Sequence, residues 1–153
     1  MYELAYGSKC RETEGLDLAD VAKLVRKDIA AAVKAGKLPA LKASVRIDRD
    51  AGGQSLDVTI TEYAGQVLNV ERMVEEAANP HDHTQTPWLD PEAAKAEAAV
   101  KAIVWAYNFD GSEIMTDYFH VRFYGGVECA DELKKRDRAK FTGKPWVDPR
   151  TVK

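Results

Sequence analysis

The sequence has few of the residues and runs that mark several common protein classes. It contains only two cysteines, Cys10 and Cys129, in 153 residues. Two are too few for the disulfide framework of a small secreted protein, so we expect free thiols. No apolar run approaches the ~20 residues needed to cross a bilayer. Residues 1–15 lack a basic start followed by an apolar stretch, so no secretion signal is expected. These features predict a cytoplasmic protein with no membrane partner.

Motifs that mark common enzyme sites are missing as well. The sequence has no G-x-S-x-G, no H-E-x-x-H, no dinucleotide fingerprint and no phosphate-binding glycine loop. His81 and His83 flank Asp82, but without a second ligand pair they fit a polar loop better than a zinc site. On a strand, Asp117 and His120 would point to opposite faces and could not act as an acid–base pair. We therefore predict a protein that is not an enzyme, with no catalytic residue, no cofactor and no metal.

Charge is distributed unevenly along the chain. The net charge of -3 combines +3 over residues 1–49 (10 basic, 7 acidic), -12 over residues 50–133 (4 basic, 16 acidic) and +6 over residues 134–153 (8 basic, 2 acidic). Either the basic tail from about residue 134 folds over the acidic body and neutralises it, or it is an arm for phosphate or an acidic partner. The length predicts a single domain over residues 1–153 that includes this tail.

The most regular pattern lies in residues 41–61. Apolar and polar residues alternate on both sides of Gly52 and Gly53, which predicts an antiparallel hairpin with one buried face. The glycines supply the positive φ that a tight hairpin loop requires. The face predicted to be buried holds the apolar residues Leu41, Ala43, Val45, Ile47, Leu56, Val58 and Ile60.

The other elements follow from periodicity. Apolar residues three and four apart predict helices over residues 16–35, 67–78 and 90–107. A third strand is predicted over residues 117–124, short strands over residues 2–6 and 127–129, and a charged helix over residues 130–140. Long amphipathic helices with a few alternating strands predict a two-layer α+β fold, in which a small antiparallel sheet of three to four strands has helices packed on one face.

With helices on one side only, the polar side of the sheet stays open. We predict that it contacts a partner through these residues: Arg46, Thr59, Tyr118, His120, Arg122 and Tyr124. Aromatic and basic side chains on a sheet also stack bases and hold phosphates, so nucleic acid is the alternative to a protein partner, although the acidic middle of the chain would repel a polyanion. The same residue types also suit a solvated strand face on which Arg46 pairs with Asp57. The oligomeric state is left open, since an exposed edge strand would allow pairing with a second copy.

Three segments together resemble a known family. They are KASVR (residues 42–46), GGQSLDV (residues 52–58) and YNFDGSEIMTDYFHVRFYGGV (residues 107–127). They are similar to the K-x-SVR strand, the GGxSxDV return strand and the YN-x-D…DYF-x-V-x-FY segment of the large polyvalent protein-associated domain of type twenty-nine. The resemblance covers residues 18–127 and leaves out the basic tail. It implies an accessory module of a phage or other mobile element, with no catalytic residues to carry over. We therefore expect a non-enzymatic accessory protein that binds a host or phage protein in the bacterial cytoplasm.

Overall fold

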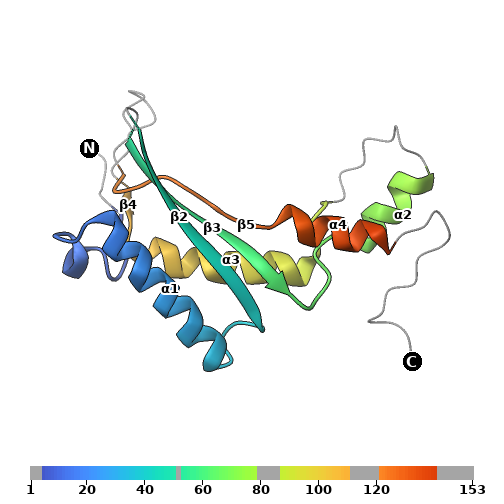
Figure 1. Ribbon diagram of the computed structural model, residues 1–153, viewed down its shortest axis with the longest axis horizontal. Coiled ribbons are helices and arrows are strands. Elements are labelled where there is room, and N and C mark those ends of the chain that lie inside the picture. The colour runs from blue at the N-terminus through green and yellow to red at the C-terminus, as the bar shows by residue number, and fades with distance from the viewer. Residues whose placement is uncertain (1–4, 51–52, 79–86, 111–120, 141–153) are drawn as a thin grey trace.

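The computed structural model describes residues 5–50, 53–78, 87–110 and 121–140. Within these ranges α1 and α3 pack on one side of a three-stranded sheet, and the predicted α+β class with helices on one face is confirmed (Figure 1). The elements in chain order are β1 (Ala5–Tyr6), the 3-10 helix η1 (Arg11–Thr13), α1 (Leu18–Lys34), β2 (Leu41–Asp50), β3 (Gly53–Tyr63), α2 (Val70–Ala78), α3 (Pro91–Trp105), β4 (Phe109–Asp110), β5 (Val127–Cys129) and α4 (Asp131–Ala139).

The sheet has the strand order β2-β3-β5 and is mixed rather than fully antiparallel. β2 and β3 form the predicted antiparallel hairpin, with Val45 opposite Val58. β5 runs parallel to β3, with Val127 opposite Val58. Tyr124 makes one further parallel bridge to Ser55. The chain therefore returns to the far edge of β3 after passing through α2 and α3, an order that hairpin patterning alone does not predict.

Residues at both ends of helix α1 explain where it begins and ends. The Asp17 side chain caps the first turn by accepting a hydrogen bond from the Ala19 nitrogen at 3.4 Å. After Lys34, Gly36 adopts a φ of 76°, which lets the chain turn back into β2 without a Cβ clash. The helix buries one stripe of residues against the hairpin: Leu18, Val21, Ala22, Val25 and Ile29.

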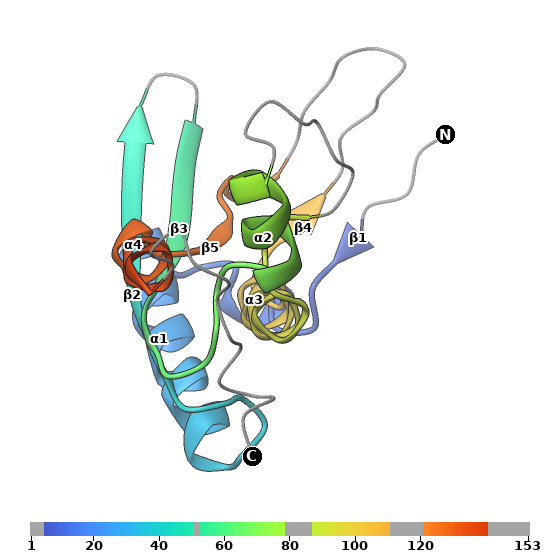
Figure 2. The same ribbon diagram turned by 90° about the vertical axis from the view of Figure 1, so that its right-hand side faces the viewer.

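The hairpin's apolar face and the two long helices form the core. The fully or nearly fully buried hairpin residues are Leu41, Val45, Leu56, Val58 and Ile60. On the helical side, α3 adds Val100 and Val104 to the same cluster. Burying each of these large side chains contributes about 1.5–3 kcal/mol. Ile47 differs from the prediction, because it is 36% exposed. The distal part of β2 extends beyond α1, which explains this exposure (Figure 2).

The approach to β5 depends on a glycine. The Leu56 nitrogen donates to the Tyr124 carbonyl at 2.7 Å, and the Val58 nitrogen donates to the Gly126 carbonyl at 3.0 Å. Between them, Gly125 has a φ of 140°, and a Cβ there would lie 2.0 Å from the Leu56 oxygen. Only glycine fits so close to the β3 backbone. Of the strand predicted over residues 117–124, residues 117–120 lie outside the described ranges.

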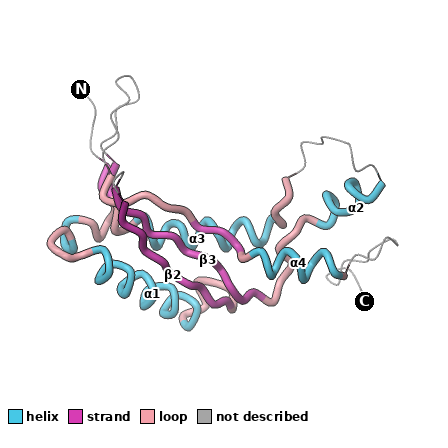
Figure 3. The backbone as a smooth tube through the Cα atoms, turned by 45° about the horizontal axis from the view of Figure 1, so that its top comes forward, coloured by secondary structure: helices cyan, strands magenta, loops and turns pink. Residues whose placement is uncertain are grey.

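Helices α2 and α4 lie at the end of the molecule opposite the distal part of the hairpin (Figure 3). Arg136 on α4 donates to the Tyr63 carbonyl at 2.5 Å and to the Gly65 carbonyl at 2.7 Å, which ties α4 to the connection after β3. Among the described helices, none has the length and apolar character to span a membrane. Cys10 and Cys129 are free, as predicted, and both are buried.

Candidate functional site

The side of the sheet away from α1 and α3 is polar, and we call it the open face. Alternation along the strands places polar side chains of all three strands on it. Exposed or half-buried, these are Lys42, Ser44, Arg46 and Asp48 of β2, Ser55, Asp57 and Thr59 of β3 with Glu62 opposite Lys42 beyond the register shift, and Glu128 of β5. Of the predicted partner-binding residues, Arg46 and Thr59 therefore lie where the sequence analysis places them.

The open face carries charges of both signs, and on β2 Asp48 accompanies Lys42 and Arg46. Arg46 lies directly opposite Asp57, as predicted for a paired strand face. The Asp57 carboxylate also accepts a hydrogen bond from the Gly126 nitrogen at 3.2 Å. Thr59 lies opposite Glu128, and a shallow depression of about 280 Å³ runs between β3 and β5 at these residues. The face thus has both of its basic groups, Lys42 and Arg46, on β2 together with Asp48, while β3 and β5 contribute only acidic charges.

Arg122 does not join Arg46 on the open face. Its guanidinium donates to the Thr13 hydroxyl at 2.9 Å and to the Tyr107 carbonyl at 2.9 Å. It also donates to the carbonyls of Thr13 and Cys10. The strand alternation used in the prediction fails because the chain here follows β3 without forming a regular strand. Arg122 therefore fastens the segment before α1 to the end of α3.

The remaining predicted residues are placed differently. Tyr124 is 46% exposed, and its ring lies beside Gly53 at the start of β3. Tyr118 and His120 belong to residues 111–120, which lie outside the described ranges. His81 and His83 belong to residues 79–86, which also lie outside them. Within the part of the chain that is described, no group of three or more His, Cys, Asp or Glu side chains could hold a metal ion.

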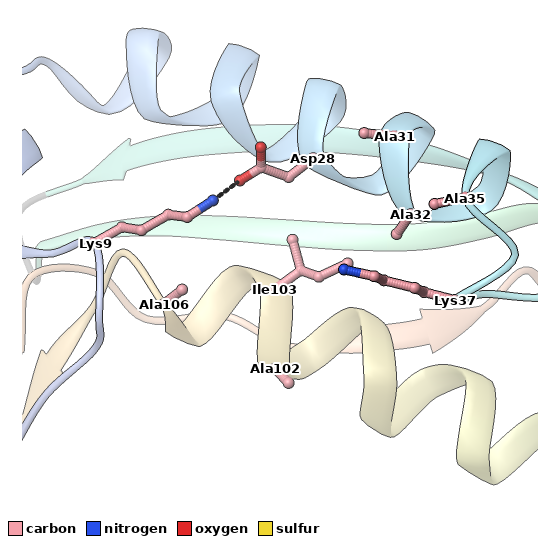
Figure 4. A pocket seen from close by; sticks show the side chains of 9 residues that line it. All are labelled: Lys9, Asp28, Ala31, Ala32, Ala35, Lys37, Ala102, Ile103 and Ala106. Carbon is pink, nitrogen blue, oxygen red and sulfur yellow. Dashed lines mark hydrogen bonds and ion pairs between the residues drawn. The ribbon is translucent and has the colours of Figure 1, made fainter.

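A second concave feature lies between α1 and α3, with a volume of about 490 Å³. Its walls are mostly methyl groups, from Ala31, Ala32, Ala35, Ala102, Ile103 and Ala106. Figure 4 shows Lys9 reaching Asp28 at one end, where Nζ lies 3.0 Å from the carboxylate oxygen, and Lys37 beside Ile103. The sequence analysis missed this groove, because alanines on two separate helices give no local sign that they face each other.

Tyr107 completes the polar end of the groove. Its hydroxyl donates to the same Asp28 oxygen that pairs with Lys9. Burial, followed by the hydrogen bond to Asp28, raises the pKa of the Tyr107 hydroxyl above its usual range. The hydroxyl therefore stays protonated and acts as a hydrogen-bond donor rather than a base. The cluster joins α1, the end of α3 and the N-terminal segment, which is a structural task.

A third concavity, of about 340 Å³, is lined by Trp88 and by side chains that include Glu97 and Arg138. The guanidinium carbons of Arg72 and Arg138 lie 4.3 and 5.1 Å from the Trp88 ring centroid, within cation–π range. Nearby, burial and then Glu97 raise the pKa of the Cys129 thiol to about 12. A thiol held protonated in this way is a poor nucleophile.

No family model matches the chain, and neither a curated protein nor a solved structure matches it. The resemblance to the large polyvalent protein-associated domain therefore stays a prediction from the sequence motifs.

Proposed function

We propose that the chain is a non-enzymatic accessory protein of a phage or other mobile element, and that it binds a host or phage protein in the bacterial cytoplasm. The observation that supports binding is the open face, a stretch of charged and hydroxyl side chains on three strands that lies on the side of the sheet away from α1 and α3. The resemblance of the three sequence segments supports the mobile-element context.

The charge arrangement favours a protein partner over a polyanion. Arg46 and Lys42 lie on β2 together with Asp48, while Asp57 and Glu128 make the β3–β5 side of the face acidic. A partner with the opposite arrangement would be steered into one orientation. A nucleic acid would gain from the basic side and be repelled by the acidic side.

The basic α4 helix gives the alternative, nucleic-acid binding, limited support. Arg136 is already committed to the Tyr63 and Gly65 carbonyls. Arg138 pairs with Glu76 at 3.2 Å. Two of the basic groups that open the tail therefore hold the fold together instead of facing a phosphate backbone.

The test is capture of partners from bacterial and phage-infected lysates with purified wild-type protein, Arg46→Glu and Thr59→Arg. The matched control is Lys101→Glu, an exposed position on α3 away from the open face. Each captured protein is then purified and its affinity measured directly. We expect the open-face variants to weaken binding at least about tenfold through lost charge complementarity, and the control to bind as wild type does.

Equal affinity for all four proteins would overturn the proposal. A gel-shift assay at low salt runs in parallel. A shift that is lost in Arg46→Glu would replace the protein partner with a nucleic acid. Turnover of a metabolite by the wild-type protein would overturn the non-enzymatic assignment.

A further inference from the structure

The outer edge of β2 presents backbone groups to solvent. β2 is the end strand of the β2-β3-β5 sheet and is 10 residues long. In an antiparallel pair, alternate residues direct their N–H and C=O groups to opposite edges. The amides of Leu56 and Val58 on β3 bond towards the β5 side. Their register partners, Ile47 and Val45, therefore direct their backbone groups outward, away from β3.

Part of this edge stays unshielded. Helix α1 packs along β2 and reaches it at two points: Arg26 donates from Nη2 to the Val45 carbonyl at 2.7 Å, and Asp17 pairs with the Arg49 guanidinium at 2.6 Å. The distal part of β2 extends past α1 (Figure 2), and Ile47 of this strand is 36% exposed. A long unshielded edge is a template for another strand, which most proteins block with a bulge, a proline or a cover. The one register shift in this hairpin lies at the other end of β2, between Lys42 and Ala43.

We propose that this edge pairs with β2 of a second copy, antiparallel across a two-fold axis at Ile47. This interface goes beyond the function proposed above and does not depend on it. Ile47 of one copy then lies opposite Ile47 of the other, and the two exchange backbone hydrogen bonds. On the open face, Arg46 of each copy lies opposite Asp48 of the other. The edge is thus complementary to itself, as an isologous interface requires.

Charge selects this register among the neighbouring ones. An axis at Arg46 would place two arginines directly opposite each other, and an axis at Asp48 would place two aspartates opposite each other. An axis at Ser44 would set Lys42 against Arg46. Like charges directly across a strand pair are destabilising, so these alignments are disfavoured.

Arg26 disfavours the remaining central alignment. An axis at Val45 would pair the amide and carbonyl of Val45 with those of Val45 in the other copy, and would bring the two Arg26 guanidiniums bound there close together at the axis, where like charges repel. With the axis at Ile47, Val45 lies off the axis opposite Arg49 of the other copy. Its carbonyl has a second lone pair for that amide.

The pairing would enlarge the recognition surface. A two-fold axis that relates adjacent antiparallel strands through a hydrogen-bonded pair runs perpendicular to the sheet. Both open faces therefore point the same way, on a continuous sheet of strand order β5-β3-β2-β2-β3-β5. The Arg46–Asp48 pairs lie in the middle of this surface.

Cysteine cross-linking tests the position of the axis. In the Ile47→Cys variant, the new thiol of one copy lies opposite the same thiol of the other copy. The Cα separation of about 5.5 Å expected for a hydrogen-bonded pair is one that a disulfide can bridge. Cys10 and Cys129 are 2% exposed and do not interfere. We expect a covalent dimer under mild oxidation. The control, Thr61→Cys, is exposed on β3 and stays monomeric. Equal cross-linking of both variants, or of neither, would overturn the proposal.

Charge exchange tests the register. Asp48→Arg leaves only arginines at positions 46 and 48, and Arg46→Asp leaves only aspartates there. Each variant alone should therefore dimerise at least about tenfold more weakly than wild type, as measured by analytical ultracentrifugation. Mixed in equal amounts, they restore both opposite-charge pairs and should form a heterodimer. Circular dichroism checks that both variants are folded. A wild-type protein that stays monomeric at all concentrations, or folded variants that do not recombine, would refute the proposal.

Discussion

The fully buried carboxylate of Asp137 accepts a hydrogen bond from the backbone nitrogen of Val67 at 2.7 Å, across 70 residues of sequence. The same oxygen accepts from the Leu68 nitrogen at 3.0 Å. The other oxygen lies 3.0 Å from the Arg136 guanidinium. One acidic side chain on α4 therefore satisfies two buried amides of the segment that leads into α2 and balances a partly buried cation.

Replacing Asp137 should be among the most damaging changes at this end of the molecule. Asp137→Ala leaves two buried amides and Arg136 without their partner, and should lower the free energy of unfolding by about 3–5 kcal/mol. Asp137→Asn keeps an acceptor and should cost less. Urea denaturation followed by circular dichroism measures both. The control is Asp131→Asn, at an exposed position on the same helix, which should stay within about 0.5 kcal/mol of wild type.

The two adjacent glycines before β5 should differ sharply. Gly125→Ala forces a Cβ to within 2.0 Å of the Leu56 oxygen at a φ of 140°. We expect a loss of at least about 2 kcal/mol, together with faster amide exchange at Leu56 and Val58. Gly126→Ala meets nothing within 4 Å and serves as the control, with near-wild-type exchange. Equal tolerance of both substitutions would show that β5 does not approach β3 as described.

Arg122 should act on the N-terminal segment and not on partner binding. Arg122→Lys keeps the charge but loses the planar fork that reaches the Thr13 and Tyr107 acceptors together. We expect a loss of about 1–3 kcal/mol and faster hydrogen exchange over residues 7–16. Arg46→Lys on the open face is the matched control, and its exchange in that segment should equal wild type. Unchanged hydrogen exchange over this segment in Arg122→Lys would show that Arg122 does not hold the N-terminal segment in place.

Cys129 should resist alkylation until the protein unfolds. The pKa of its thiol is raised from 9.0 to about 12 by burial and Glu97. At pH 9 the native thiolate fraction is therefore small, and carboxamidomethylation should run roughly 100-fold or more slower than in guanidinium. Because the unfolded chain releases this proton first, stability should fall as the pH rises above 9 towards 12. Peptide mass mapping separates Cys129 from Cys10; rapid modification of the native protein would contradict the assignment.

The periodicity of apolar residues was enough to predict the hairpin and helix α1. The alternation around Gly52–Gly53 gave the hairpin and the Arg46–Asp57 pairing, since register in a half-buried hairpin follows directly from which residues are apolar. The stripe of α1 was predicted within two residues at its start and one at its end. Ile47 broke the pattern, because its exposure depends on where α1 begins, which the strand's own sequence does not encode.

Features that depend on distant segments were not predicted. The parallel pairing of β5 joins residues that are 69 apart in the chain, such as Val58 and Val127. Arg122 was assigned to the open face by strand alternation, but its acceptors come from the segment before α1. Asp137 lies in the segment that was predicted only as a charged helix. In each case a polar group takes part in a tertiary contact that no short window of sequence reveals.

The late arrival of β5 has a consequence for synthesis. Between the moments when Tyr63 and Cys129 leave the ribosome, β3 has a neighbour on one flank only. At typical elongation rates this interval is on the order of several seconds, whereas a hairpin closes in microseconds. A nascent chain of this protein therefore exposes a folded β2–β3 hairpin with both edges unpaired. During this interval it is most vulnerable to misassembly with other nascent chains on the same polysome. Chaperones that mask extended segments would act on the chain during this interval.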